Sequence, residues 1–513
     1  MFIFSFTCIC FSSSAQYWQK FYKGNTPLNC SDAIENYDKG FYIIGASYTA
    51  PSTLYKTDIN GNILWQRSIG KQGDTTDIGA ICATQDGGIL ILGNRYRSNW
   101  ASNLYLLKIN ACGEKEWSRI YTANVNSGGI CGVKQYKNGD YVFYCDYGGT
   151  VKDYMGVVYC SNAKGSLKWQ YYSPIDNNDM YIDSLSNVIL TGHAYFRKID
   201  DTSHYDFVYA LAKLDTSGKQ DFFTQYNINK KIYGYAFSTM PSKERGYLTI
   251  GSRSVGGLEY VSSLLKCDSN GNPQWETILT DSATASEESP HSLSKINDST
   301  FFISATTNLE TSNVYQLKFI KITDKGEVLK QVPYQTSTYS LNDYRTHRTS
   351  DGKFLISGTA LNLATGTTSM FVLKVNSDLG IDSFYPGHYV YDSLCSSSVA
   401  KTGNILIDSP DTIYITVPKR TGIAAQPENQ PVFSLFPNPA KDHILLSASG
   451  LGQQRINGTV YDALGNKITE FHALPDPSGQ MTQTIDLTKL SKGMYFISIG
   501  QGTNQYLQKF VVE

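Results

Sequence analysis

Short apolar runs separated by polar turns dominate the chain from residue 38 to residue 384. One run follows a turn in blocks such as DKGFYIIG (38–45), DGGILILG (86–93) and DGKFLISG (351–358). A second pair of runs flanks another turn in blocks such as LYKTDINGNILWQ (54–66) and LLKCDSNGNPQWE (264–276). Apolar runs bounded by Asp-Gly, Asn-Gly or Ser-Gly predict β-hairpins, and no helical periodicity competes with them.

The two blocks recur together seven times at a nearly constant spacing. The aromatic residues that end the second block are Trp65, Trp117, Trp169, Phe222 and Trp275, and successive members are 52 or 53 residues apart. A fixed period of this size marks one supersecondary unit that is repeated. Four short strands per unit, seven times over, predict a seven-bladed β-propeller across residues 16–390.

The first residues of this region contain an unpaired copy of one strand. The segment QYWQKFYKGN (16–25) is similar to ILWQRSIGKQGD (63–74), which follows the hairpin turn of the first unit. We therefore expect Tyr17 to Tyr22 to supply the outer strand of the last blade, in the sheet that contains Phe354 to Gly358. Closure of this kind would leave the ring without a free edge.

The remaining segments complete an all-β organisation. Residues 1–15 are uncharged and apolar and end in small residues, which is typical of a secretory signal peptide. Residues 391–432 break the period and form a connector with one hairpin-like stretch, ILIDSPDTIYIT (405–416). Residues 433–513 read as short alternating strands, which predict a small β-sandwich.

Composition narrows the classes of partner. Charged residues make up only 17% of the chain, whereas Tyr counts 37 and Gly 43, a mixture that favours β-structure. A net charge of −1 argues against a nucleic-acid partner. After the signal peptide, no apolar stretch approaches the roughly 18 residues of a membrane helix. We expect an exported protein with no membrane span.

Ten cysteines are present, two of them in the signal peptide, and none forms a CxxC pair. Cys131 and Cys145 lie equally far from Asn138 at a predicted hairpin turn. Opposite residues of a hairpin come within reach of a disulfide. A Cys131–Cys145 disulfide and two buried thiols both remain open.

The block D-x-N-G-N-x-x-x-W resembles the tryptophan-docking motif of quinoprotein-type propellers, since Gly61 to Trp65 and Gly271 to Trp275 keep its Gly-to-Trp step. The resemblance implies blade packing for Trp65, Trp117, Trp169, Phe222 and Trp275, and no catalysis. The block also resembles the Asp-box of sialidase-like propellers. Its spacing departs from S-x-D-x-G-x-x-W by one residue, which does not favour sialidase chemistry.

Two repeated polar features have competing explanations. Asp58, Asn60 and Asn62 could ligate calcium, but they lack the closing Glu of an EF-hand loop, and the same residues favour a tight turn. A lysine recurs at one position of six units and could bind an acidic glycan, or it could pack its stem on an aromatic ring and extend its ammonium into solvent. These lysines are Lys56, Lys108, Lys213, Lys266, Lys321 and Lys374, and Cys160 replaces them in the remaining unit.

Motifs for chemistry are absent from the sequence. The seven histidines show no metal-ligand spacing, and there is no phosphate loop or nucleophile elbow, so we expect no metal and no cofactor. Catalytic carboxylates of a propeller would come from different blades and cannot be chosen from sequence. Longer connections such as 194–206 and 281–291 are where a site would depart from the repeat.

The tail carries a more specific resemblance. Its matching residues are Phe436, Pro437, Asn438 and Pro439 in FSLFPNPAKD, Gly465 in VYDALGNKI, Gly493 and Tyr495 in KGMYFISI, and Lys509 near the end. In this pattern the tail resembles the C-terminal sorting domain of substrates of the type IX secretion system of Bacteroidetes, with Phe in place of Tyr at 436. The resemblance implies passage across the outer membrane and delivery to the cell surface or the medium, with the secretion machinery as a partner.

Two functions remain for the propeller. Repeats this uniform favour a scaffold for binding or adhesion, with a surface glycan or a protein as ligand. A secreted hydrolase or lyase acting on polysaccharides is the alternative, because tyrosine-rich loops can stack on sugars. Whether the protein is an enzyme is left open, with the balance towards binding alone.

Overall fold

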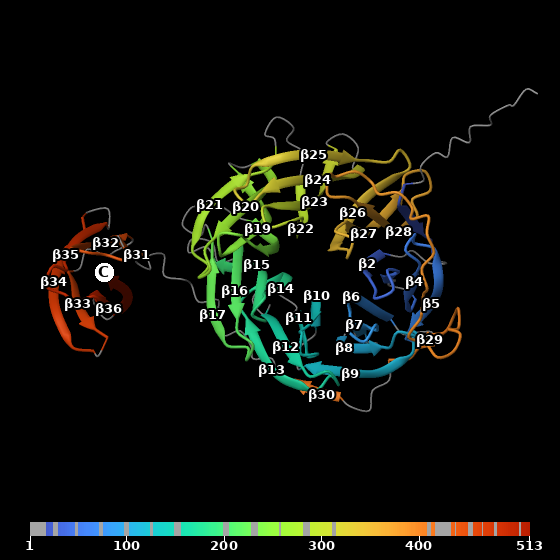
Figure 1. Ribbon diagram of the computed structural model, residues 1–513, viewed down its shortest axis with the longest axis horizontal. Coiled ribbons are helices and arrows are strands. Elements are labelled where there is room, and N and C mark those ends of the chain that lie inside the picture. The colour runs from blue at the N-terminus through green and yellow to red at the C-terminus, as the bar shows by residue number, and fades with distance from the viewer. Residues whose placement is uncertain are drawn as a thin grey trace, which may run out of the picture. The chain divides into compact units, whose positions relative to one another are not determined.

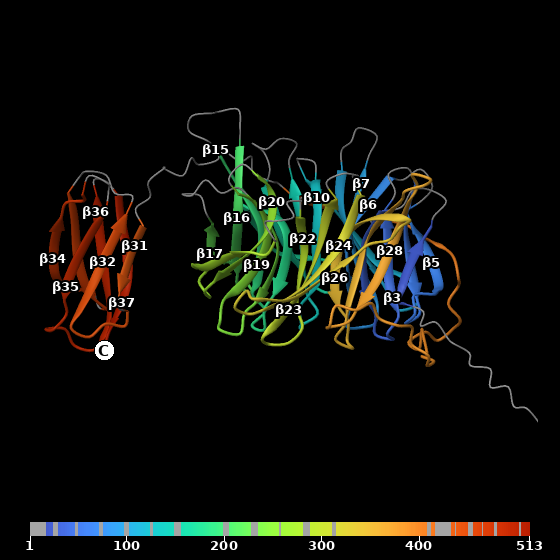
Figure 2. The ribbon, with the colours of Figure 1, turned by 90° about the horizontal axis from the view of Figure 1, so that it is seen from above.

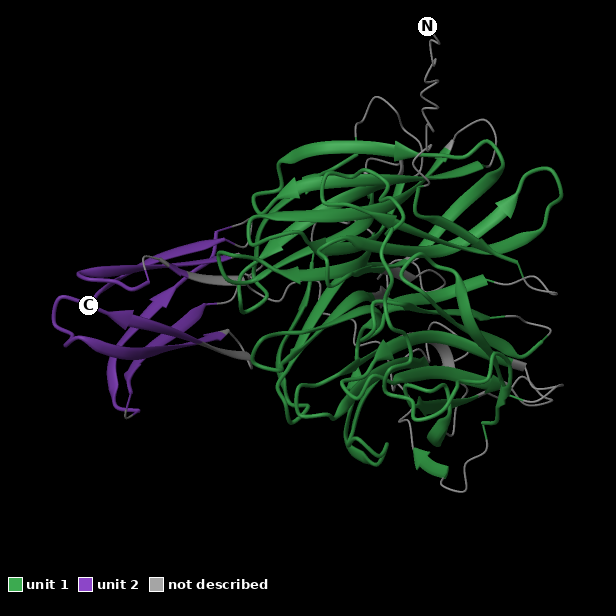
Figure 3. Ribbon diagram, turned by 45° about the vertical axis from the view of Figure 1, so that its right-hand side comes forward, with its two compact units in different colours: residues 1–423 green, residues 424–513 purple. Residues whose placement is uncertain are grey.

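The computed structural model describes residues 17–23, 29–46, 50–70, 75–96, 102–123, 127–147, 155–197, 205–226, 234–255, 258–280, 288–309, 314–407, 412–415, 432–436, 438–449, 455–463, 465–476, 480–501 and 504–513. The chain forms two compact units, Met1–Ile423 and Ala424–Glu513 (Figure 3). The expected signal peptide lies outside the described residues. Every named element is a β-strand, and the described part contains no helix that could span a membrane.

Seven sheets of consecutive antiparallel strands make up unit 1. Sheet 1 contains β2 (Asn29–Glu35), β3 (Phe41–Ala46), β4 (Ser52–Thr57) and β5 (Ile63–Ile69), and sheet 2 contains β6 (Thr75–Ala83), β7 (Ile89–Tyr96), β8 (Ser102–Ile109) and β9 (Lys115–Ala123). Sheet 3 contains β10 (Ser127–Gln135), β11 (Tyr141–Tyr147), β12 (Met155–Ser161) and β13 (Leu167–Ser173), and sheet 4 contains β14 (Asp176–Ile182), β15 (Val188–Arg197), β16 (Tyr205–Leu214) and β17 (Gln220–Gln225). Sheet 5 contains β18 (Gly234–Pro241), β19 (Tyr247–Val255), β20 (Leu258–Cys267) and β21 (Pro273–Ile278), and sheet 6 contains β22 (Glu288–Lys295), β23 (Thr300–Leu309), β24 (Val314–Thr323) and β25 (Val328–Tyr334). Sheet 7 contains β26 (Tyr339–Arg348), β27 (Phe354–Asn362), β28 (Thr368–Val375) and β1 (Gln19–Tyr22).

The seven sheets stand side by side around a common axis, with the first strand of each sheet towards the centre (Figures 1 and 2). Each first strand contacts the first strand of the next sheet, and β26 of sheet 7 contacts β2 of sheet 1. The apolar clusters lie between neighbouring sheets, for example between sheets 1 and 2 around Tyr42, Trp65 and Tyr105. Radial repetition of four-stranded sheets is the architecture of a β-propeller.

The N-terminal strand completes sheet 7, as the sequence predicts. Strand β1 runs antiparallel to β28 with Gln19 opposite Leu373 and Tyr22 opposite Met370. Trp18 follows the same pattern as the docked aromatic residues of the other sheets, because a Cβ on Gly61 would lie 3.3 Å from its ring. The two ends of the repeat region are therefore joined within one sheet.

Each of the five aromatic residues that end the second block lies against a glycine of the next sheet's hairpin turn. The pairs are Trp65 with Gly113, Trp117 with Gly165, Trp169 with Gly218, Phe222 with Gly271 and Trp275 with Gly326, and a Cβ on any of these glycines would lie 2.6 to 2.9 Å from the ring. All five glycines have φ between 76° and 83°, where a side chain is strained. Sheet 6 has Lys330 at the aromatic position, and its Nζ donates to the Asp378 carbonyl at 2.8 Å.

The hairpin turns use their acidic residue to hold the backbone. Asp58 Oδ1 accepts from the backbone N–H groups of Asn60 and Asn62 at 2.8 Å, and Asn62 Nδ2 donates to Asp58 Oδ2. Asp268 repeats this pattern in sheet 5. These carboxylates act as turn residues, as the alternative to calcium supposes.

Three of the six recurring lysines form buried ion pairs and so differ from the expectation that their ammonium groups extend into solvent. Lys56 is 0% exposed and pairs with Asp38 at 2.5 Å, and Lys108 and Lys374 are also buried and pair with Asp86 and Asp351 at 2.9 Å. In these three sheets a carboxylate on the turn before the second strand is close enough to neutralise the ammonium, so burial does not leave an unpaired charge.

Residues 391–407 and 412–415 pack along the outside of sheets 1 and 2, and we call these two stretches the strap. Strand β29 (Asn404–Ile405) runs parallel to β5, and β30 (Thr412–Ile415) runs parallel to β9. The hairpin expected between these two stretches is therefore wrong: each pairs with the free edge of a different sheet. A disulfide joins Cys395 to Cys112 in the β8–β9 turn, with 5.6 Å between their Cα atoms.

Unit 2 has two antiparallel sheets that share one apolar cluster. One contains β31 (Val432–Phe436), β32 (His443–Ser449) and β35 (Met481–Asp486). The other contains β34 (Lys467–Ala473), β33 (Ile456–Asp462), β36 (Gly493–Gln501) and β37 (Asn504–Val512). Alternating buried residues such as Ile444, Leu446, Ile497 and Ile499 form the core from both sheets.

Candidate functional site

The innermost strand of every sheet in unit 1 carries a β-bulge at the same place. In each case one extra residue interrupts the pairing of the first strand with the second. The extra residues are Ser31, Gly79, Cys131, Asn178, Phe237, His291 and Tyr344. A bulge bends its strand and redirects a side chain, and bulges are common next to functional sites. The backbone is repeated around the axis, while the residue types at the bulge differ.

Asp32 follows the bulge of β2 and connects three sheets. Its Oδ1 lies 2.7 Å from His347 Nε2 of sheet 7 and accepts from the Ala33 N–H at 2.9 Å, and its Oδ2 accepts from the Ile81 N–H of sheet 2 at 3.1 Å. Burial alone would raise the pKa of Asp32, but the charge and hydrogen bond of His347, with Arg345 and the Ile81 N–H, lower it below the ordinary value. Asp32 is therefore a carboxylate that orients His347.

Arg345, the residue after the bulge of β26, links sheet 7 to Asn178, the bulged residue of sheet 4. Its guanidinium donates to the backbone carbonyl of Asn178 in sheet 4 at 3.5 Å, and Asn178 Nδ2 donates to the Ala236 carbonyl of sheet 5 at 2.8 Å. Sheets on opposite sides of the ring are thus linked by polar side chains.

A second acidic residue, Asp343, lies fully buried just before the bulge of β26. Its Oδ1 accepts from Thr306 Oγ1 of sheet 6 at 2.7 Å and lies 3.5 Å from His291 Nε2. Asp343 Oδ2 is buried and has no hydrogen-bond partner among the described residues. A buried carboxylate oxygen with an unused acceptor position suits a bound hydroxyl group or water.

Aromatic rings lead from this carboxylate to sheet 4. Phe237 lies 5.8 Å from the ring of His291 and 6.4 Å from Tyr235, and Tyr235 stacks on Phe207 at 4.0 Å. His193 lies edge-on to Tyr235 at 4.7 Å, and burial lowers its pKa although Asp176 acts in the opposite direction. We call Phe207, His193, Tyr235, Phe237, His291 and Asp343 the aromatic arc.

The arc follows the bulges of the first strands around the axis. Phe237 and His291 are the bulged residues of β18 and β22, and Asp343 comes just before the bulge of β26. His193 of β15 lies opposite Asp176, the first residue of β14. The arc offers flat apolar faces beside polar atoms, a combination that suits binding of polyhydroxylated molecules.

The described residues hold no group of three or more His, Cys, Asp or Glu side chains that could bind a metal ion. The residues around the axis can form hydrogen bonds and stack on a ligand, and they include one imidazole, that of His347, which Asp32 orients.

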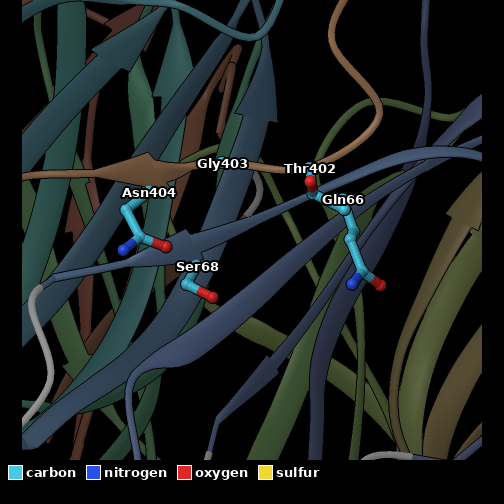
Figure 4. Close-up of a pocket in the computed structure, with 5 residues that line it drawn as sticks. All are labelled: Gln66, Ser68, Thr402, Gly403 and Asn404. Atoms are coloured by element: carbon cyan, nitrogen blue, oxygen red, sulfur yellow. The ribbon is translucent and has the colours of Figure 1, made fainter.

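The hollow between β5 and the strap is less suited to chemistry (Figure 4). It has a volume of about 330 Å³ and is lined by Gln66, Ser68, Thr402, Gly403 and Asn404. These five residues carry no ionisable group. Two backbone hydrogen bonds already join the strap to β5 beside this hollow, from Gln66 N to Lys401 O and from Ser68 N to Gly403 O.

The Cys131–Cys145 disulfide stays a prediction. The backbone register places Cys145 opposite Ile130, with Cys131 as the bulged residue. The Cys131 side chain lies outside the described residues. Most of the connections 194–206 and 281–291 also lie outside them, although His193 and His291 border these connections. The Cys112–Cys395 disulfide was not foreseen, because connectivity across 283 residues leaves no local pattern.

Several residues of the predicted tail motif meet on the last strand of unit 2. Asn438 Nδ2 donates to the Lys509 carbonyl at 3.2 Å, and Asn438 Oδ1 accepts from the Val511 N–H at 3.0 Å. Tyr495 stacks on Phe510 at 5.7 Å and donates to the Ser491 carbonyl. Gly465 has φ 84° at its turn, and Gly493 begins β36. Pro437 and the side chain of Phe436 lie outside the described residues, and Pro439 follows a cis peptide bond.

The residues of the arc were missed by sequence reasoning because they come from four sheets. The bulge positions equivalent to Phe237 and His291 hold Ser31, Gly79, Cys131, Asn178 and Tyr344 in the other sheets, so the sequence repeat alone does not single out the arc.

Comparisons with known proteins give few matches by sequence. No curated protein matches the chain. Among solved structures, the chain is similar to the β-propeller domain of the Trilobed protease from Pyrococcus furiosus, with a TM-score of 0.43, 10% identity and coverage of 73% of this chain and 97% of that one. It is also similar to YCF48 from Cyanidioschyzon merolae, with a TM-score of 0.41, 9% identity and coverage of 69% and 98%.

One family match is specific to the tail. Residues 434–513 match the family described as the secretion system C-terminal sorting domain. This match agrees with the motif residues that converge on β37, and it implies export through the type IX secretion system to the cell surface or the medium. The C-terminal part of the chain is therefore a secretion sorting domain.

Proposed function

We propose that unit 1 is a closed seven-bladed β-propeller that binds a ligand outside the cell, after export directed by the tail. In this proposal residues 1–15 are a signal peptide, residues 16–390 form the propeller, residues 391–432 connect it to the tail, and residues 433–513 form a β-sandwich that the secretion machinery recognises. The docked aromatic residues and buried lysines serve packing between blades.

The aromatic arc carries the binding part of the proposal. Packing between blades is solved by the same residue types in nearly every sheet, whereas the arc departs from the repeat. In the arc, Tyr235 stacks on Phe207 and meets His193 edge-on, and Phe237 contacts His291. His291 Nε2 lies 3.5 Å from Asp343, whose Oδ2 is buried without a partner among the described residues. A sugar has an apolar ring face and hydroxyl donors, so a surface glycan is the ligand class that fits best.

A glycan array probed with the mature full-length protein tests this binding. Phe237→Ala and His291→Ala should each weaken the signal by about tenfold, because both remove a ring from the arc. Tyr414→Ala is the matched control, since Tyr414 is 83% exposed on β30 and distant in topology from the arc. Equal binding by all three variants would contradict a ligand site at the arc.

The alternative is a polysaccharide hydrolase or lyase, and one observation favours it. Asp32 holds His347 Nε2 at 2.7 Å, which is how a carboxylate orients an imidazole that takes up a proton. Release of reducing ends or of unsaturated sugars by the purified protein, abolished by His347→Ala, would establish this alternative in place of binding alone.

A further inference from the structure

A hollow of about 680 Å³ lies at the place where the two ends of the propeller join, and we call it the seam pocket. Its lining residues are Tyr17, Gln19, Lys20, Asn60, Asn62 and Phe384. They come from the N-terminal strand, from the β4–β5 turn and from the segment after β28. Its volume falls in the range of small-molecule sites.

The walls of the seam pocket are held together by hydrogen bonds between these three segments. Trp18 Nε1 donates to the Ile59 carbonyl at 2.7 Å. Asn60 Oδ1 accepts from the Tyr385 N–H at 2.7 Å, and Asn60 Nδ2 donates to the Tyr385 carbonyl at 2.9 Å. The pocket is thus preformed, which lowers the entropy cost of binding.

Exposed aromatic rings gather around the pocket. Tyr17 is 66% exposed and lines it, and Phe384 is half-buried beside it. Tyr385 and Tyr389 are 45% and 38% exposed, with 5.1 Å between their ring centroids. Large rings that remain in solvent around a hollow are typical of a binding surface.

Lys20 is the only charged residue in the lining. Its Nζ donates to Asn62 Oδ1 at 2.9 Å and lies 4.8 Å from the ring centroid of Phe384. It forms no ion pair within the part of the chain that the structure describes. An ammonium group has three donors, so a position remains for an anionic oxygen.

We propose that the seam pocket binds a sugar residue that carries a carboxylate, such as a uronic acid of an acidic polysaccharide. The sugar ring stacks on Tyr17 and Phe384, its hydroxyl groups bond to the amides of Gln19 and Asn62, and its carboxylate pairs with Lys20. This site is separate from the aromatic arc and does not depend on it.

Calorimetric titration of the mature full-length protein tests the proposal. The probes are oligomers of galacturonate, glucuronate and mannuronate, and the matched neutral oligomers of galactose, glucose and mannose. At least one acidic oligomer should bind more tightly than its neutral counterpart. Lys20→Met keeps the apolar stem of the side chain but removes its charge. It should weaken the binding of that acidic oligomer by about tenfold and leave the binding of the neutral oligomer unchanged.

Controls separate this site from the arc and from loss of folding. Lys325→Met removes an exposed lysine on the β24–β25 turn of sheet 6, which is the equivalent of the β4–β5 turn that lines the seam pocket. This substitution should leave the binding of every oligomer unchanged. An unchanged unfolding midpoint shows that Lys20→Met is folded. Absence of binding by every acidic oligomer, or binding that survives Lys20→Met, overturns the proposal. Loss of binding in Phe237→Ala with Lys20→Met unaffected would assign the ligand to the arc and also overturn it.

Discussion

At the scale of the residue, the propeller separates side chains that pack from side chains that converge on the axis. The docked aromatic residues each lie on a glycine of the next sheet, and this contact is the same in every pair. The axial residues differ from sheet to sheet, and Asp32 and Asp343 are buried among them. One prediction tests the docked aromatic residues, and another tests the buried carboxylates near the axis.

Gly165→Ala tests the docking contact. Gly165 has φ 79°, and a Cβ there would lie 2.8 Å from Trp117. Gly139 is the matched control, because it has φ 88° and no atom within 4 Å of a built Cβ. Gly139→Ala should cost about 1 kcal/mol of unfolding free energy from backbone strain alone, and Gly165→Ala about 2 kcal/mol more from overpacking. Equal costs in urea unfolding would show that the ring contact is loose.

Asp32→Asn tests the axial carboxylate. The pKa of Asp32 is lowered from 3.8 in the folded state, so its charge stabilises the fold above that value, and this contribution is lost as the pH falls through the lowered pKa. An amide has one acceptor oxygen in place of two, so one of the N–H groups of Ala33 and Ile81 loses its partner. We expect a loss of about 2 kcal/mol at neutral pH, which shrinks in acid below the ordinary pKa.

The matched control for Asp32 is Asp298→Asn. Asp298 pairs with Lys295 at 2.9 Å but is 84% exposed, so its substitution should leave the unfolding midpoint unchanged at neutral pH. A destabilisation by Asp32→Asn that is equally large in acid would contradict the role given to its charge.

At the scale of the element, the strap adds strands to a ring that is already closed. Strands β29 and β30 cover the outer edges of sheets 1 and 2, and Ile405 and Ile415 are buried in the clusters of those sheets. Arg67 donates to the Ala400 carbonyl at 2.7 Å, which holds the strap close to Cys395. The disulfide to Cys112 links this added layer to sheet 2.

Cys395→Ser should loosen the strap. Removing a cross-link between residues 283 apart typically costs about 2 to 4 kcal/mol, so the unfolding midpoint should fall and proteolysis after residue 395 should become faster. Cys112→Ser and the double variant should behave like Cys395→Ser, since one bond is lost in each case. Additive losses in the double variant would show that the thiols act separately.

The sequence repeats made it possible to predict the strands and the pairing of the N-terminal strand with the last sheet. The features that were missed depend on short strands or on contacts between sheets. Asp-Gly and Asn-Gly turns mark hairpins locally, and Trp18 marks the copy that completes sheet 7. The strap was missed because β29 spans two residues and β30 four, too few for a pattern. The bulges leave no turn residue, and the arc depends on contacts between sheets, so neither could be derived from one stretch of sequence.

At the scale of the whole molecule, the two units have separate cores, and we have proposed a separate task for each. The core of unit 2 is built from its own strands, and its motif residues meet on β37. None of these residues belongs to the aromatic arc or to the seam pocket. Export and binding should therefore be separable by deletion.

The most direct test of this division is the surface fraction of the protein in a host with type IX secretion, measured with and without residues 433–513. We expect the full chain at the surface or in the medium, and the shortened chain folded in the periplasm with its glycan binding intact. Surface delivery of the shortened chain at normal levels, or a shortened chain that is folded but no longer binds, would contradict the account.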